Sequence, residues 1–147
     1  MSATPSTADP FTLELQHIRG LIEANQLPQA AQALNAAQKK APKDARLPLL
    51  GMRMAERVGN LENATQAARR ALALAPDWQV AQIELALLLA RQKQGDEAMR
   101  LAMQALANAP RDAQVMVGAI NVALFSERHD QTLAWAEEGV RRFPDNA

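Results

Sequence analysis

The sequence lacks cysteine and is poor in aromatic residues, histidine and glycine. Its 147 residues include 2 Trp, 3 Phe, no Tyr, 2 His and 6 Gly. Without cysteine, the chain forms no disulfide, no zinc–thiolate site and no cysteine nucleophile. Hydrophobic residues still make up 48% of the chain, and they are mostly alanine and leucine. Because these two residues lose little side-chain freedom in a helix, the composition favours helices over sheets.

An excess of charge of either sign is also missing. Lys and Arg together number 16, as do Asp and Glu, and this balance gives no general attraction to nucleic acid or to an anionic membrane. The first residues, MSATPSTADP, contain no Lys or Arg, which is atypical of a signal peptide. No apolar run approaches the ~18 residues that cross a bilayer. We therefore expect a cytoplasmic protein in which residues 1–10 form a flexible tail.

Prolines divide the rest of the chain at equal intervals. Pro42, Pro76, Pro110 and Pro144 are spaced 34 residues apart, and an Asp follows each within two positions. Because proline is not tolerated in the interior of a helix, each of these residues marks a helix end. Equal spacing is typical of repeats, and it predicts units at residues 11–44, 45–78, 79–112 and 113–146.

Each unit is expected to hold two helices joined by a short turn. In the second unit, Asp44 can cap the first helix, and Pro48 falls in or just after its first turn, where a missing N–H costs least. The mid-unit turns are predicted near residues 25–28, at Gly59-Asn60, at Gly95-Asp96 and near residues 128–130.

Residues of one size recur at fixed places in these helices. In the second helices, two columns of small residues lie seven positions apart, hence on one face, where they let two helix backbones approach closely. The first helices carry two columns of mostly larger apolar residues. In repeat order the columns are Ala30, Ala64, Ala98 and Thr132; Ala37, Ala71, Ala105 and Gly139; Ile18, Met52, Ala86 and Ile120; and Leu21, Ala55, Leu89 and Ala123.

These features resemble the tetratricopeptide repeat (TPR) family. The segments GNLENATQAARRALALAPD and QGDEAMRLAMQALANAPRD are similar to the family pattern, and the resemblance covers residues 11–146. It implies an all-α fold, a right-handed α-superhelix (α-α solenoid) of four helix-turn-helix repeats whose first helices line a concave groove. The family's aromatic sites are largely Leu, Ala or Met here, and the first and fourth units match less well. Related helical-pair repeats are the alternative fold.

The sequence contains no constellation that predicts catalysis. His17 is expected to be a partly buried packing residue, and His129 an exposed turn residue. Neither has a metal ligand at a suitable spacing on one helix face, and no phosphate-binding or dinucleotide-binding motif is present. We therefore expect a protein that is not an enzyme, with no catalytic residue, no cofactor and no metal.

The resemblance implies that the groove side of the first helices binds a partner. One groove column is apolar throughout, and arginines recur four and eight residues further on, although the apolar column could instead belong to the core. The expected ligand is a protein or peptide segment with apolar anchors and an acidic group, and not nucleic acid or a membrane. The predicted binding residues are Leu15, Arg19, Leu49, Arg53, Arg57, Ile83, Leu87, Arg91 and Asn121.

Some family members hold a C-terminal carboxylate with Lys and Asn at fixed groove sites. The corresponding positions here carry Leu15, Arg19, Leu50, Val80 and Glu84. Only one of these residues is cationic, so this ligand is not inferred.

An interaction module is the leading interpretation, and two alternatives remain. The array could be the N-terminal targeting or oligomerisation region of a larger bacterial multidomain enzyme, or it could serve self-assembly alone. In the last helix an apolar arc, with Trp135 at its edge, has no following repeat to cover it. This arc predicts possible homo-oligomers through an uncapped C-terminal repeat, and it consists of Leu133, Ala136, Val140 and Phe143.

Overall fold

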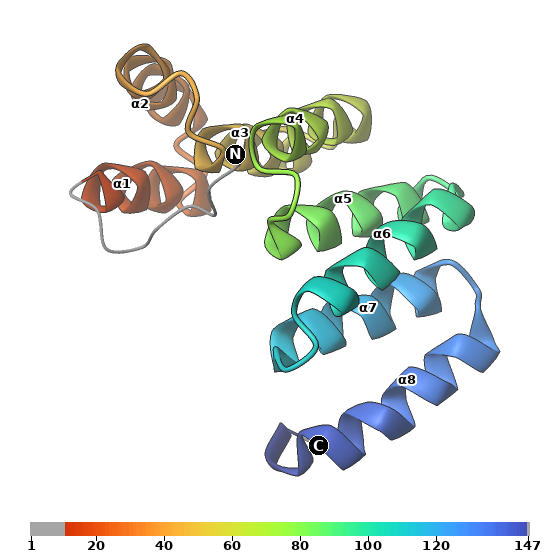
Figure 1. Cartoon of the computed structure of the whole chain (residues 1–147). Coiled ribbons are helices and arrows are strands. Elements are labelled where there is room, and N and C mark those ends of the chain that lie inside the picture. Colours follow the sequence, from red (N-terminus) through yellow and green to blue (C-terminus); the bar gives the residue numbers. More distant parts are fainter. Residues whose placement is uncertain (1–10, 147) are drawn as a thin grey trace. The chain divides into compact units, whose positions relative to one another are not determined.

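The chain is all-helical over residues 11–146, which are the residues that the computed structural model describes (Figure 1). Eight α-helices and one short 3₁₀ helix occur in this range, which contains no β-strand. The predicted tail, residues 1–10, lies outside the described residues. The chain divides into two compact units, Met1–Pro76 and Asp77–Ala147, each with four of the α-helices. The predictions of an all-α fold and of four helix-turn-helix pairs are confirmed.

The first unit is built from two helical pairs. Its helices are α1 (Thr12–Glu23), α2 (Leu27–Lys40), α3 (Arg46–Arg57) and α4 (Leu61–Leu74). Helix α3 packs on α1, α2 and α4, and α1 also packs on α2. A cluster of buried side chains from the first three helices forms the core here, namely Leu15, Ile18, Ile22, Ala30, Leu34, Ala37, Leu47 and Leu50.

The second unit repeats this arrangement. Its helices are α5 (Gln79–Arg91), α6 (Gly95–Asn108), α7 (Ala113–Phe125) and α8 (His129–Arg142), followed by the 3₁₀ helix η1 (Pro144–Asn146). Helix α7 packs on α5, α6 and α8. The predicted repeat boundaries stay predictions, but each helical pair lies within one of the predicted frames.

Every second helix ends two residues before a proline. The last residues of these helices are Lys40, Leu74, Asn108 and Arg142. The residue after each helix has φ between −131° and −142° and ψ between 64° and 78°, outside the α region that a following proline disfavours. The prolines therefore end the second helices as the sequence predicted.

The turns inside the repeats follow the period, not the glycines. Asn25, Gly59, Lys93 and Glu127 all have positive φ, between 59° and 76°. In each turn the next N–H donates to the carbonyl five residues earlier, as Gln94 does to Leu89, which is a Schellman closure. The predicted turn at Gly95-Asp96 is therefore wrong, because Lys93 takes the left-handed position and Gly95 begins α6.

The two histidines lie elsewhere than expected. His17 is exposed, not partly buried. Its counterpart one repeat later is Gly51, where an added Cβ would lie 3.9 Å from Leu34 of α2. This position therefore faces the preceding helical pair, and α1 has no such pair within the described residues. His129 is exposed as predicted, but it is the first residue of α8 and does not lie in the turn.

The small and apolar columns are largely buried, as predicted. Ala30, Ala64 and Ala98 have no exposed surface, nor do Ala37, Ala71 and Ala105. Ile18, Met52 and Ala86 of the first helices are also fully buried. The exceptions are half-buried. They are Thr132, Gly139 and Ile120 of the fourth repeat, and Leu21 and Ala55 of the first and second repeats.

Asp44 binds the start of α3 from just outside the helix. The N-cap residue is Ala45, and Asp44 Oδ1 accepts from the Arg46 N–H at 3.0 Å. The Arg46 guanidinium also reaches both carboxylate oxygens, at 3.0 Å from Nε and 2.6 Å from Nη2. Burial alone would raise the pKa of Asp44, but the Arg46 hydrogen bonds and charge outweigh it and hold this pKa below its usual value.

The Asp44→Asn substitution should lower the free energy of unfolding at neutral pH by about 1–3 kcal/mol, because it removes a charge-assisted pair. The folded-state pKa is depressed, so this stabilisation is present above the unfolded pKa of about 3.9 and is lost as pH falls below it. Urea titrations of both proteins at several pH values measure the difference. A difference that grows as the solution becomes more acidic would contradict the assignment.

The same substitution should have opposite effects at two glycines. Gly59→Ala forces a side chain into the left-handed region and should lower the free energy of unfolding by about 1 kcal/mol. Gly20→Ala lies inside α1, where among the described residues the added Cβ meets nothing within 4 Å except the nearby backbone of its own helix. This substitution should raise the free energy of unfolding by about 0.5–1 kcal/mol. Chemical denaturation of the two variants checks both signs, and equal signs would refute the turn geometry.

Candidate functional site

The predicted apolar groove column is mostly core. Leu15, Leu49 and Ile83 are only 6–8% exposed. Leu15 lies in the first unit's core cluster, and Ile83 packs on Gly118, where an added Cβ would lie 2.5 Å from Ile83 Cγ2. The alternative that the sequence left open is therefore the one that the structure supports for these three residues. They offer no surface strip to a ligand.

In the first unit, the remaining predicted residues are arginines on α1 and α3. Arg19 and Arg57 are exposed and Arg53 is half-buried. Arg57 Nη2 lies 3.4 Å from the Glu23 carbonyl at the end of α1. This arginine therefore links the two first helices of the unit. Because α1 and α3 pack together, the three cations lie on neighbouring helices.

In the second unit, the exposed side of α7 is a mostly apolar stripe. Val117, Leu124 and Phe125 are 48%, 49% and 53% exposed, and Asn121 between them is half-buried. Their spacing of four, seven and eight residues puts them on one face of the helix. The neighbouring positions Val115, Met116, Val122 and Ala123 are buried. We call Val117, Asn121, Leu124 and Phe125 the α7 stripe.

Helix α5, which packs on α7, continues this surface. Leu87 is half-buried, Arg91 is exposed and Val80 is 42% exposed. Sequence reasoning identified Leu87, Arg91 and Asn121 but not Val80 or Leu124 as binding residues. Leu124 lies seven residues after Val117 and hence on the same face of the helix, so the sequence could have pointed to it. Whether the Leu124 side chain is exposed, however, depends on how α7 packs on its neighbours.

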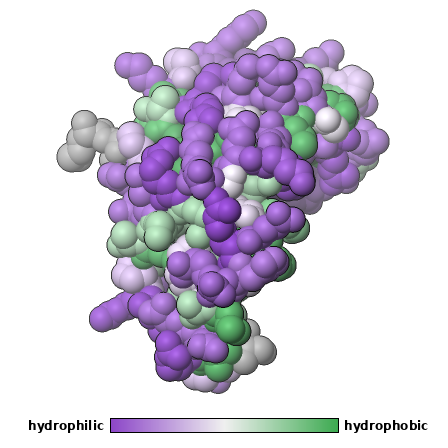
Figure 2. Space-filling view, turned by 90° about the vertical axis from the view of Figure 1, so that its right-hand side faces the viewer, coloured by the Kyte–Doolittle hydropathy of each residue, from purple (hydrophilic) through white to green (hydrophobic). Residues whose placement is uncertain are grey.

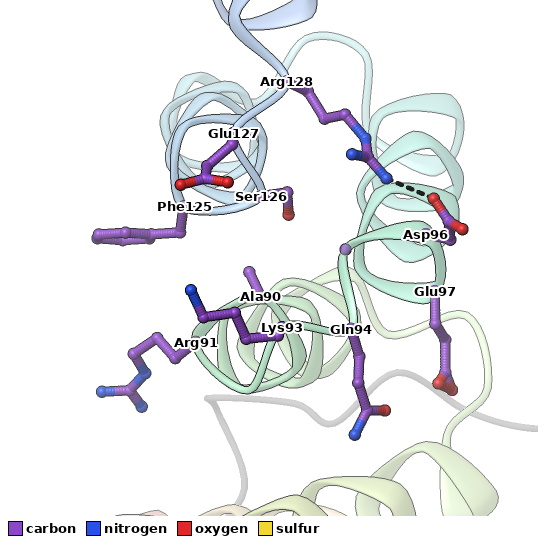
Figure 3. A pocket seen from close by; sticks show the side chains of 11 residues that line it. Ala90, Arg91, Lys93, Gln94, Asp96, Glu97, Phe125, Ser126, Glu127 and Arg128 are labelled. Carbon is purple, nitrogen blue, oxygen red and sulfur yellow. Dashed lines mark hydrogen bonds and ion pairs between the residues drawn. The ribbon is translucent and has the colours of Figure 1, made fainter.

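A pocket of about 480 Å³ lies where these two helices end. Figure 3 shows the Phe125 ring and the Arg91 guanidinium on the same side of this pocket. Its charged lining is balanced, with Arg91, Lys93 and Arg128 against Asp96, Glu97 and Glu127. Arg128, the N-cap residue of α8, pairs with Asp96 in the first turn of α6.

Close packing shapes the inner wall of the pocket. Ser126 is 9% exposed, and its hydroxyl has no hydrogen-bond partner among residues 11–146. An added Cβ on Gly95 would lie 3.2 Å from Ser126 Cβ and 3.4 Å from Arg128 Nη2. The absence of a side chain at Gly95 therefore leaves space for these two side chains, which explains why glycine suits a position outside the turn.

Residues 11–146 lack two other kinds of site. No group of three or more His, Cys, Asp or Glu side chains there could hold a metal ion. No helix in the same range combines the length and apolar character needed to cross a membrane.

Comparison with known proteins shows the fold. No protein-family model and no curated protein matches the sequence. The structure is similar to that of TTC0263, a thermophilic TPR protein of Thermus thermophilus, with a TM-score of 0.75 and 18% identity, over 95% of this chain and 76% of that one. It is also similar to PilW, a widely conserved type IV pilus biogenesis factor, with a TM-score of 0.77 and 17% identity, over 91% of this chain and 63% of that one.

A third similar structure belongs to a larger enzyme. The O-GlcNAc transferase of Thermobaculum terrenum matches with a TM-score of 0.70 and 21% identity, over 92% of this chain but only 27% of the transferase chain. At these identities the similarity concerns the fold alone. The chain therefore has the helix-turn-helix fold of TPR proteins.

Proposed function

We propose that this chain is a protein-interaction module that holds a segment of a partner protein on its first helices and catalyses no reaction. The α7 stripe carries this proposal. Much of the rest of this helix is buried, and the accessible side of such a helix would ordinarily be polar. An exposed group of apolar side chains on such a helix is typical of a binding surface.

Figure 2 shows one face of the molecule, on which hydrophilic residues predominate and hydrophobic residues form small scattered patches. Repeat proteins of this kind use extended surfaces on their stacked helices for binding. The fold therefore supports an interaction role independently of the stripe.

The partner segment would carry an apolar anchor beside an acidic group. Phe125 offers a large, exposed ring for the apolar contact, and aromatic residues often dominate binding energy. Arg91 on α5 can donate a pair of hydrogen bonds to a carboxylate. In the first unit, Arg19, Arg53 and Arg57 offer a second place for acidic groups. The buried Leu15, Leu49 and Ile83 have no direct role in this proposal.

Salt should affect this binding only mildly. The pocket beside Phe125 and Arg91 is lined by three cationic and three anionic side chains. Attraction to an acidic segment is therefore local, and it adds little to the long-range steering that salt screens.

The match to the O-GlcNAc transferase favours a second candidate role. The part of that enzyme that matches this chain makes up 27% of the enzyme chain. In that setting the same stripe would position a substrate protein or another part of the enzyme. The binding surface is the same in both roles, but the chain that carries it differs.

Substitution of Phe125 tests whether the partner binds at the α7 stripe or elsewhere on the chain. With a partner isolated by pull-down from the source cell, Phe125→Ala should weaken affinity at least ~10-fold, about 1.4 kcal/mol, because it removes the anchor. The matched control is Met103→Ala on α6, since Met103 is 54% exposed and Phe125 53%. Calorimetric titration measures both. Loss of binding in the Met103 variant alone would place the site on the second helices and refute the proposal.

A further inference from the structure

An apolar pocket lies open between α7 and α8. It has a volume of about 130 Å³ and is lined by Ala113, Met116, Val117, Ile120, Ala136, Gly139, Val140 and Phe143. Val140 is 56% exposed and Phe143 is half-buried. The apolar arc predicted for the last helix is thus largely accessible. Trp135, which was predicted at the edge of this arc, is only 8% exposed.

The first unit shows what fills such a pocket. Three repeats earlier, 102 positions back, Val117, Ile120 and Gly139 correspond to Leu15, Ile18 and Ala37. There the same positions of α1 and α2 form a closed core with Leu47 and Leu50 of α3, and Met54 packs against it. A first helix from the following repeat therefore occupies this place inside the chain.

Helix α1 has the matching face uncovered. Leu13 is 76% exposed, whereas its counterparts Leu47 and Val115 are 1% and 4% exposed. At Gly20, the counterpart of Met54, an added Cβ would meet nothing within 4 Å among the described residues, apart from the nearby backbone of α1 itself. His17, which corresponds to Gly51, is exposed as well. Among the described residues, therefore, one end offers a pocket for a first helix and the other offers a first helix without a pocket.

We propose that α1 of a second copy of this chain packs into the pocket between α7 and α8, in the way that α3 packs on α1 and α2. Leu13 of the second copy would enter beside Val140 and Phe143. The contact is head-to-tail, so each added copy presents a new open pocket. Copies therefore add one after another unless the assembly closes into a ring.

The face of α1 makes this contact weaker than the internal one. Polar Gln16 and His17 and the bare Gly20 stand where α3 carries Leu50, Gly51 and Met54. Less apolar surface is buried as a result, and the stabilisation by burial falls with it. The association should accordingly be reversible and depend on protein concentration.

Two polar contacts join adjacent repeats within the chain, and residues at the same repeat positions could make similar contacts between two copies. Arg128 pairs with Asp96, and Arg142 Nη1 donates to the Pro110 carbonyl at 3.0 Å. At the same repeat positions, Gln26 of the second copy would face Asp130, and Lys40 would face the Pro144 carbonyl. The Arg57 contact with the Glu23 carbonyl has no counterpart, because Glu23 cannot donate.

Symmetric pairing of two α7–α8 surfaces fits the structure less well. It would place two pockets face to face, and neither would receive a helix. Leu13 would also stay exposed. The head-to-tail contact covers both apolar surfaces at once, which is why we favour it.

Two blocking variants and their mixture test the proposal. By analytical ultracentrifugation, the average mass of the wild-type protein should rise above the 16.0 kDa of one chain as concentration increases. Leu13→Glu and Val140→Glu should each remain monomeric, because each puts a charge into the contact. Their equimolar mixture should form a dimer and stop there, since one variant keeps the pocket and the other keeps α1.

Control variants show whether a loss of association comes from the proposed contact, from unfolding of the variant or from the proposed partner surface. Both blocked side chains are more than half exposed, so circular dichroism should show intact helices. The milder pair Leu13→Gln and Val140→Thr should weaken association in the same pattern. Met103→Glu, at a similarly exposed site on α6, should leave association unchanged, as should Phe125→Ala.

Three results would overturn the proposal. The first is a wild-type protein that is monomeric at all concentrations. The second is association that survives Leu13→Glu but not Val140→Glu, which would indicate symmetric pairing. The third is a mixture of the two blocked variants that stays monomeric.

Discussion

The packing of a first helix onto the helical pair before it is the interaction on which the rest of this structure depends. In the first unit, Leu47 and Leu50 of α3 close a core that α1 and α2 leave open by themselves. Fully buried alanines, such as Ala30 and Ala37, keep the helix backbones close enough for this packing. No pair buries its apolar face alone, so stability is shared between neighbours.

The surfaces available for binding follow from this packing. Because α7 is held by α5, α6 and α8, much of it is buried, and the α7 stripe that remains exposed is mostly apolar. The same packing leaves a pocket beside α8 and an uncovered Leu13 on α1. One repeated contact therefore accounts for both the proposed partner surface and the proposed contact between copies.

The sequence predicted the architecture well because its signals are local and periodic. Pro76 ends a helix through its own ring and missing N–H, whatever surrounds it. The turn of the third repeat was missed because Gly95 is the obvious breaker in the sequence, whereas the helix closure places Lys93 in the left-handed region. The burial of Ile83 was equally hidden, since it depends on Gly118 of another helix. Exposure in a repeat array is set by neighbours, and a single sequence does not display them.

The central claim is that a partner lies on the first helices of the second unit. Hydrogen–deuterium exchange of the chain with and without its bound partner tests this most directly, because it reports each helix separately without altering any residue. When the partner is bound, exchange should become slower along α5 and the C-terminal half of α7, and it should stay unchanged along the second helix α6. Slower exchange confined to α6 and α8, with α5 and α7 unaffected, would contradict it.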